Sequence, residues 1–130
     1  MSVHPFPPAQ VLLVEDDDNA REMFADALRM TGYRVRTAAD GLAGLRMVEA
    51  FDPDVVVVDL ALPIANGFDV LNELRAVSRT HQTPVIAISG NERRLQQAKA
   101  TPGFFGILEK PFDPQRLVRM VDRARRYTHN

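Results

Sequence analysis

Polar side chains with metal-binding and nucleophilic chemistry directly follow three apolar runs of this sequence. The runs and the polar residues after them are residues 11–14 before Glu15 and Asp16, residues 55–58 before Asp59, and residues 85–88 before Ser89. Runs rich in valine and isoleucine are typical of strands buried on both faces. Open parallel sheets bind their ligands at the carboxyl ends of such strands. We therefore expect these side chains to meet at one edge of a sheet.

The chemistry that this group predicts is metal-assisted phosphoryl transfer. Carboxylates held together repel one another unless a cation neutralises them. The chain has no cysteine, so the ligands it offers are hard oxygens, which favour Mg²⁺ or Mn²⁺. Lys110 follows a fifth short apolar run and adds a positive charge. The oxygens of a phosphoryl group need positive charge and hydrogen-bond donors, which a divalent ion, a lysine and a hydroxyl supply. A carboxylate can itself be the nucleophile that accepts the phosphoryl group.

Strand-like and helix-like patterns alternate along the chain. The predicted strands lie near residues 11–14, 33–38, 55–58, 85–88 and 106–109, and each is followed by a helix-like segment. Five such units predict an α/β fold in which helices cover both faces of a parallel sheet. We expect one domain over residues 10–128, preceded by a proline-rich flexible leader at residues 1–9 and followed by a tail at residues 129–130.

Local signals mark the ends of several predicted helices. The first helix has five apolar residues at the spacing of one helical face: Ala20, Met23, Phe24, Ala27 and Leu28. Asp17 or Asp18 is expected to cap its start, and Gly32 to end it in the left-handed conformation. Asn66 is the predicted cap of the third helix. The fourth helix, over residues 91–100, is short, with only Leu95 and Ala98 expected to be buried.

Composition excludes several classes of protein. The net charge of -1 gives no overall attraction to nucleic acid or to an anionic membrane, and no stretch is long enough to span a bilayer. Nothing indicates secretion, so a cytoplasmic protein is expected. The histidines, His4, His81 and His129, are expected to face solvent. The arginines of the last helix are typical of a solvated face, which disfavours nucleic-acid binding. They are Arg116, Arg119, Arg123, Arg125 and Arg126.

Six short pieces of the sequence together resemble the receiver domains of two-component response regulators. They are VLLVEDD at 11–17, ADG at 39–41, PDVVVVDLALP at 53–63, NGF at 66–68, PVIAISG at 84–90 and LEKPF at 108–112. Each is weak alone, but their order and spacing are specific. The resemblance covers about residues 10–128. It implies a flavodoxin-like, doubly wound parallel sheet with strand order 2-1-3-4-5, five helices and three layers.

The resemblance also implies a role for each residue of the site. Asp59 would accept a phosphoryl group from a sensor histidine kinase or a histidine phosphotransfer protein. Glu15, Asp16, Asp59 and the backbone carbonyl of Ala61 would hold Mg²⁺ or Mn²⁺. Lys110 would pair with the phosphoryl oxygens, and Ser89 would turn inward toward them. The chain would be a phosphoacceptor signalling domain that catalyses only its own phosphorylation and dephosphorylation, rather than an enzyme acting on other substrates.

Family members of this kind signal through the surface around the fourth helix, the fifth strand and the last helix. The resemblance therefore implies a downstream effector protein, and a monomer or a weak dimer formed through that surface. Ile107 departs from the family, which usually has tyrosine or phenylalanine three residues before the lysine. Our hypothesis is that Ser89 and Ile107 transmit the signal through altered packing of the fourth helix rather than through an aromatic flip.

The sequence leaves three alternatives to a phosphoacceptor function. A pseudo-receiver would keep the fold as an interaction module without phosphate switching; the complete acid, serine and lysine set argues against it, and Ile107 leaves it open. A phosphatase with an aspartate nucleophile, of the haloacid dehalogenase kind, would be expected to have the motif Asp-x-Asp at the nucleophile. Here Asp59 is followed by Leu60 and Ala61, so the second acid is absent and this class is disfavoured. A nucleotide-binding module is disfavoured because no glycine-rich loop follows the first strand.

Overall fold

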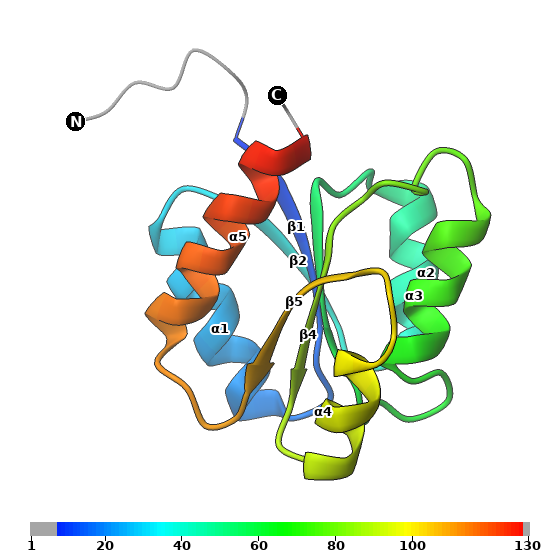
Figure 1. The fold of residues 1–130 in the computed structure, drawn as a ribbon. Coiled ribbons are helices and arrows are strands. Elements are labelled where there is room, and N and C mark those ends of the chain that lie inside the picture. The colour runs from blue at the N-terminus through cyan, green and yellow to red at the C-terminus, as the bar shows by residue number, and fades with distance from the viewer. Residues whose placement is uncertain (1–7, 129–130) are drawn as a thin grey trace.

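A computed structural model describes residues 8–128 and shows five strands alternating with five helices (Figure 1). The elements are β1 (Gln10–Val14), α1 (Asp18–Met30), β2 (Arg34–Ala38), α2 (Gly41–Ala50), β3 (Val55–Asp59), α3 (Gly67–Ala76), β4 (Val85–Ser89), α4 (Glu92–Lys99), β5 (Phe104–Glu109) and α5 (Pro114–Thr128). All strand pairs are parallel, in the order β2-β1-β3-β4-β5. The predicted flavodoxin-like fold and strand order are confirmed.

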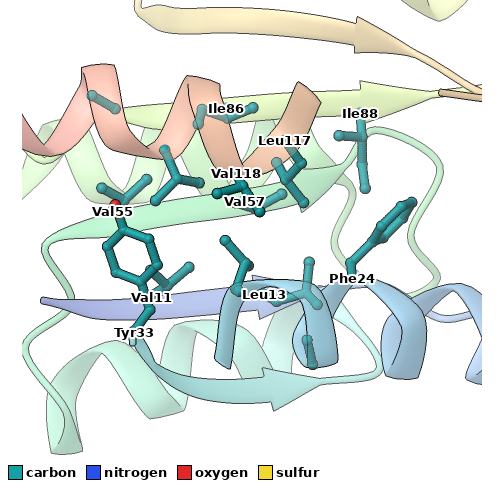
Figure 2. Close-up of a cluster of buried hydrophobic side chains, with 14 of the residues drawn as sticks. Val11, Leu13, Phe24, Tyr33, Val55, Val57, Ile86, Ile88, Leu117 and Val118 are labelled. Atoms are coloured by element: carbon teal, nitrogen blue, oxygen red, sulfur yellow. The ribbon is translucent and has the colours of Figure 1, made fainter. Parts of the chain in front are cut away.

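Two apolar layers hold the helices against the sheet. Successive residues of a strand point to opposite faces, so each central strand contributes to both layers. Figure 2 shows the layer beneath α1 and α5. Its labelled members are Val11, Leu13, Phe24, Tyr33, Val55, Val57, Ile86, Ile88, Leu117 and Val118. On the other face, Leu12, Val14, Val56 and Val58 pack with α2 and α3. The buried valines of β3 therefore fix the strand that ends in Asp59.

Polar side chains at the starts of the helices fix the turns that follow the strands. Asp17 caps α1 and accepts a hydrogen bond from the backbone of Ala20. Asn66 and Asp69 form a capping box at the start of α3. Gly32, at the end of α1, has a φ of 104°. These features confirm the predicted helix ends.

β5 begins two residues earlier than predicted, and it contains a bulge. Val85 pairs with Phe104 and Ile86 with Gly106, so Phe105 is an extra residue in the strand. The Phe104 ring packs edge-on against Phe68, with 5.8 Å between ring centroids. The Phe105 ring packs against Tyr127 at 5.8 Å. Thr101, Pro102 and Gly103 are typical of a turn, so the sequence did not predict that β5 begins at Phe104. The aromatic partners of Phe104 and Phe105 come from segments that are distant in the sequence.

β2, at the opposite edge of the sheet, carries exposed arginines. Arg34 and Arg36 alternate with the half-buried Val35 and Thr37. The guanidinium carbon of Arg36 lies 5.0 Å from the centre of the Phe51 ring. This cation–π contact covers an aromatic side chain at the border of the α2 layer. β2 therefore presents two exposed positive charges, Arg34 and Arg36, among its first three residues.

Some predictions concern residues outside the described range. His4, His129, most of the leader at residues 1–9 and the tail at residues 129–130 lie outside it. His81 is described and exposed, as predicted. Met23, expected on the inner face of α1, is 47% exposed. Of the described helices, none combines the length and apolar character needed to cross a membrane.

Tyr33, in the turn between α1 and β2, is linked to α5 through its hydroxyl, which donates a hydrogen bond to Asp122. Burial and the neighbouring carboxylate raise the pKa of Tyr33, so the hydroxyl stays protonated at neutral pH. We expect Tyr33→Phe to lower the free energy of unfolding by about 1–2 kcal/mol, because a hydrogen bond to a charged acceptor is lost. Urea denaturation measures this change. Tyr127→Phe is the control, since Tyr127 is 74% exposed, and an equal loss there would contradict the prediction.

Candidate functional site

The carboxyl ends of the strands bring the predicted acids and lysine together. Glu15 follows β1, Asp59 is the last residue of β3, and Lys110 follows β5. One carboxylate oxygen from each of Glu15, Asp16 and Asp59 lies within 4.8 Å of the others. Glu15 is fully buried and Asp59 is 5% exposed, whereas Asp16 is exposed. The expected meeting of these three acids at one edge of the sheet is therefore observed.

Lys110 bridges two of the acids. Its Nζ atom lies 2.7 Å from Oδ2 of Asp59 and also donates a hydrogen bond to Oε1 of Glu15. Its backbone N–H donates to the carbonyl oxygen of Ser89 at 2.8 Å, which ties the lysine to the end of β4. The side chain is only 25% exposed, so these ion pairs are partly shielded from water. The lysine is held directly against the predicted phosphoacceptor.

Burial and charge shift the ionisation of this group. Burial of Glu15 raises the pKa of its carboxyl group, and the charge of Asp59 adds to this effect, while the hydrogen bond from Lys110 opposes it. Burial lowers the pKa of Lys110, but its contacts with Asp59 and Glu15 outweigh burial and leave the pKa raised. Lys110 is therefore charged at neutral pH and partly neutralises the acids.

Both carboxylate oxygens of Asp59 have hydrogen-bond partners. Oδ2 contacts Lys110, and Oδ1 accepts a hydrogen bond from the backbone N–H of Ala61 at 2.8 Å. Ala61 is also the residue whose backbone carbonyl is predicted to bind the metal, and that role stays a prediction. The Asp59 side chain is thus oriented by its own loop on one side and by β5 on the other.

Ser89 and Ile107 lie beside the acidic group. Ser89 ends β4, is fully buried, and its hydroxyl accepts a hydrogen bond from the backbone of Asn91 at 3.1 Å. In this arrangement Ser89 supports the turn into α4, the capping-type role that is the usual alternative to phosphate binding. Ile107 is half-buried and packs against a small cluster beneath α4. That cluster consists of Leu60, Ala87 and Ala98, with Phe68 and Phe104 beside it.

Two residues, Arg21 and Gly41, support the site in ways that the sequence does not predict. Arg21 in α1 donates from Nη1 to the backbone carbonyl of Glu15 at 2.9 Å and to that of Asp16 at 3.4 Å. A Cβ atom added to Gly41, at the start of α2, would lie 1.9 Å from the carbonyl oxygen of Ala65. Arg21 therefore holds the backbone of the acidic turn, and Gly41 allows the loop after β3 to pack closely. Arg21 belongs to no recognisable motif, and Gly41 belongs to the ADG piece at 39–41, for which the sequence predicts no packing role.

The acidic group fits a hard divalent cation. Carboxylate oxygens are the donors that Mg²⁺ and Mn²⁺ prefer, and Mg²⁺ usually retains several waters when it binds to one or two carboxylates. Glu15, Asp16 and Asp59 each offer one oxygen within the same small volume. The exposure of Asp16 leaves one side of the group open to solvent. The donor set and its accessibility both suit an ion that keeps part of its hydration shell.

Comparison with known proteins gives one consistent result. Residues 11–122 match the family described as response regulator receiver domain. Regulator of RpoS from Escherichia coli is 37% identical over 114 residues, which are 86% of this chain and 33% of that protein. The chain spans a quarter to about half of the length of the first curated relatives that it matches.

Solved structures agree. Chemotaxis response regulator CheY4 of Vibrio cholerae superposes with a TM-score of 0.81 at 33% identity, covering 90% of this chain and 98% of that one. The receiver domain of sensor histidine kinase PA1611 from Pseudomonas aeruginosa superposes with a TM-score of 0.79 at 32% identity, covering 89% and 96%. That structure has a magnesium ion coordinated in its active site cleft.

Proposed function

Because the chain belongs to the family of response regulator receiver domains, we propose that it accepts a phosphoryl group on Asp59 and passes the signal on. Domains of this family act in two-component signal transduction and are signalling domains rather than conventional enzymes. The observation that carries the proposal for this chain is the contact of 2.7 Å between Lys110 Nζ and Asp59 Oδ2, beside two further acids. A cation placed against a nucleophilic carboxylate suits the transfer of a phosphoryl group.

The proposed donor is the phosphohistidine of a sensor histidine kinase or of a histidine phosphotransfer protein. An Oδ atom of Asp59 attacks phosphorus, the phosphorus–nitrogen bond breaks, and the electron pair leaves with the imidazole nitrogen. The product is an aspartyl phosphate on this chain. Lys110, already bonded to Asp59, offsets the negative charge that the phosphoryl oxygens bring. A cytoplasmic location of the protein is part of this proposal.

The proposed metal ligands are the carboxylates of Glu15, Asp16 and Asp59 and the carbonyl of Ala61. The ion supplies positive charge to the phosphoryl oxygens and reduces the repulsion among the carboxylates. The chain's own contribution is to hold these oxygens in place. Burial keeps Glu15 fixed, the Ala61 N–H orients Asp59, and Arg21 holds the backbone of the turn that carries Glu15 and Asp16.

Phosphorylation of Asp59 adds a charge of about -1.5 to -2, and we propose that Ser89 and Lys110 respond to it. The Ser89 hydroxyl would leave the Asn91 backbone and bind the phosphoryl group, which would loosen the start of α4. Ile107 packs beneath that helix, so altered packing there would reach the surface that a downstream effector contacts. Comparing structures with and without a phosphoryl mimic tests this, and an unchanged α4 would contradict it.

The central test is chemical phosphorylation of the purified chain. Incubation with Mg²⁺ and acetyl phosphate is expected to add one phosphoryl group, stable in acid and labile in base, as seen by mass spectrometry. Asp59→Asn is expected to abolish the adduct. Asp52→Asn, which changes an exposed acid paired with Arg79, is the control and should leave it intact. A folded protein without any adduct would favour a pseudo-receiver, and turnover of unrelated phosphoesters would favour a phosphatase.

Magnesium is expected to stabilise the fold even without phosphate. At a free Mg²⁺ concentration ten times its dissociation constant, binding to the folded state alone adds about 1.4 kcal/mol. This corresponds to a rise of about 5 °C in the thermal midpoint of a chain of this size. Differential scanning calorimetry with Mg²⁺ and with EDTA measures the rise. Asp16→Asn should reduce it and Asp52→Asn should not; an equal rise in both variants would place the ion elsewhere.

A further inference from the structure

The last turn of α3 carries an arginine that holds the turn between α4 and β5 (Figure 1). The Nη2 atom of Arg75 donates a hydrogen bond to the carbonyl oxygen of Gly103 at 2.9 Å. Its Nη1 atom donates to the carbonyl oxygen of Thr83 at 2.8 Å and, more weakly, to that of Thr80 at 3.4 Å. One guanidinium group therefore joins the segment before β4 to the segment before β5.

The charge of Arg75 strengthens these bonds. The side chain is half-buried, and burial lowers the pKa of its guanidinium. The group is nevertheless charged at neutral pH, because the ordinary pKa of arginine is far higher. Within residues 8–128, Arg75 forms no ion pair with a carboxylate, so its donors are directed to backbone carbonyls. A hydrogen bond from a charged donor is roughly twice as strong as one between neutral groups.

Two apolar side chains on the same face of α3 support this contact. Phe68, Leu71 and Arg75 have the spacing i, i+3 and i+7, which places them on one side of a helix. A Cβ atom added to Gly103 would lie 3.3 Å from Cδ2 of Leu71, so the backbone of the turn lies directly against that leucine. The ring of Phe104 packs edge-on against Phe68. These three residues of α3, which we call the α3 anchor, hold the turn before β5 at three points.

The start of α4 is held to the sheet by a weaker contact. The backbone N–H of Asn91 donates to the hydroxyl of Ser89 at 3.1 Å, which is a bond between neutral groups. Gly90, between them, is exposed. Apart from its chain neighbours, a Cβ atom added to Gly90 would have one atom within 4 Å, the Cβ of Lys110 at 3.7 Å. The start of α4 is therefore freer to move than its end.

The α3 anchor and the phosphoacceptor lie at opposite edges of the sheet. Thr83 and Gly103 come before β4 and β5, whereas Asp59 and Ser89 end β3 and β4. All these strands are parallel. α4 runs from one edge to the other, since it begins after β4 and ends before β5. Charge added at the phosphoacceptor thus acts on the start of α4, while the anchor acts on its end.

We propose that Arg75 is a positioning residue that fixes the end of α4, so that the helix pivots about residues 101–104 when Asp59 is phosphorylated. This role rests on the proposed function, in which the Ser89 hydroxyl leaves the Asn91 backbone and binds the phosphoryl group. A helix released at one end and held at the other rotates about the held end, so its first turn moves most and its last turn least. Without the anchor, both ends shift. Arg75 thereby sets the direction in which the signal moves α4.

Hydrogen exchange of the unphosphorylated chain tests the anchor. Arg75→Met removes the guanidinium donors, so the amides of residues 101–105 should exchange roughly ten-fold faster. Arg79→Met is the matched control. Arg79 also donates to a backbone carbonyl, that of Val48 at 3.1 Å, and its described partners do not include the turn before β5. It should leave the exchange of residues 101–105 unchanged. Natural exchange rates there in Arg75→Met, or an equal increase in Arg79→Met, would overturn the proposal.

Distance measurements test the pivot. The chain has no cysteine, so nitroxide labels attach only to introduced cysteines. Glu49→Cys on α2 provides the reference, and it is paired with Arg93→Cys at the start of α4 or with Lys99→Cys at its end. All three residues are exposed. With Mg²⁺ and beryllium trifluoride, a phosphoryl mimic, the distance between positions 49 and 93 should change and that between positions 49 and 99 should not. In Arg75→Met both distances should change.

The pivot and the proposed function fail in different ways. Absence of an acetyl phosphate adduct on the natural chain would contradict phosphoryl acceptance, while the exchange comparison without phosphate still decides whether Arg75 holds the turn. An adduct together with equal shifts at positions 93 and 99 in the natural chain would overturn the pivot. Arg75→Met should still form the adduct, because the anchor lies at the edge opposite the phosphoacceptor.

A second variant covers the case in which Arg75→Met impairs folding, as seen by circular dichroism. Phe68→Leu keeps an apolar side chain and removes the ring contact with Phe104. It should raise the exchange of residues 101–105 by about three-fold, and no increase there would overturn the anchor.

Discussion

Replacing Lys110 with methionine is expected to lower the free energy of unfolding at neutral pH by about 2–4 kcal/mol, measured by urea denaturation in the presence of EDTA. Methionine keeps much of the length of the side chain but removes its charge. Glu15 is fully buried and lies beside the nearly buried Asp59, and Lys110 bridges the two. Removing one partner of a buried ion pair leaves uncompensated charge, which costs more than the pair contributes. The partial exposure of Lys110 keeps the expected loss below the upper limit for buried pairs.

The same variant should show a distinct pH dependence. The hydrogen bond from Lys110 lowers the pKa of Glu15, so its removal raises that pKa further above its value in the unfolded chain. A carboxyl group whose pKa is raised by folding stabilises the fold fully only below its unfolded pKa. That contribution is lost as the pH rises through the folded pKa. The gap between the variant and the natural chain should therefore narrow as the pH falls from 7 toward about 4.5.

Two further variants make this prediction specific. Glu15→Gln combined with Lys110→Met removes the buried charge as well as its partner, and should recover much of the lost stability. Lys99→Met removes an exposed lysine of α4 and should change stability by less than about 0.5 kcal/mol. An equal loss for Lys110→Met at pH 4.5 and pH 7 would show that packing of the lysine stem, rather than its charge, dominates.

Gly41→Ala is expected to lower the free energy of unfolding by about 2–4 kcal/mol. The added Cβ atom would lie 1.9 Å from the carbonyl oxygen of Ala65 and 2.7 Å from its carbonyl carbon. These are backbone atoms, so the clash cannot be relieved by turning a side chain. Either the start of α2 or the loop after β3 has to move. Because that loop leads from Asp59 to α3, we also expect slower phosphorylation by acetyl phosphate.

Gly90→Ala is the matched control for this clash. The nearest heavy atom to an added Cβ there is the Cβ of Lys110 at 3.7 Å, an ordinary van der Waals distance. The same chemical change should therefore cost much less stability, although the residue lies next to Ser89. Thermal and urea unfolding compare the two variants directly. Equal losses would show that loss of glycine as such, rather than contact with Ala65, determines the effect.

The sequence predicts most of this site because each functional side chain is adjacent to a strongly apolar strand. The four valines before Asp59 make β3 recognisable, and a parallel sheet necessarily places the ends of its strands at a common edge. The same reasoning places Glu15 and Ser89. The position of Asp59 and Glu15 directly after apolar strands is therefore enough to predict that the two residues meet, without knowledge of their contacts.

Other features depend on contacts that local patterns do not encode. The early start of β5 and its bulge at Phe105 rest on aromatic neighbours in α3 and α5. Arg21 has the spacing of an ordinary helical arginine, and only the fold shows that it binds the carbonyls of the acidic turn. Met23 lies at the border of the apolar face of α1, where helical spacing alone does not distinguish exposure from burial.

The two edges of the sheet also bear on the solubility of the protein. An edge strand presents unpaired backbone groups that can add a strand from another molecule and begin aggregation. β2 carries the exposed Arg34 and Arg36 along one edge, and like charges would face each other if two such edges came together. β5, at the other edge, is interrupted by the bulge at Phe105, which breaks the regular spacing that a new strand needs. The sheet is thus protected against growth beyond five strands by charge on one side and by irregular backbone on the other.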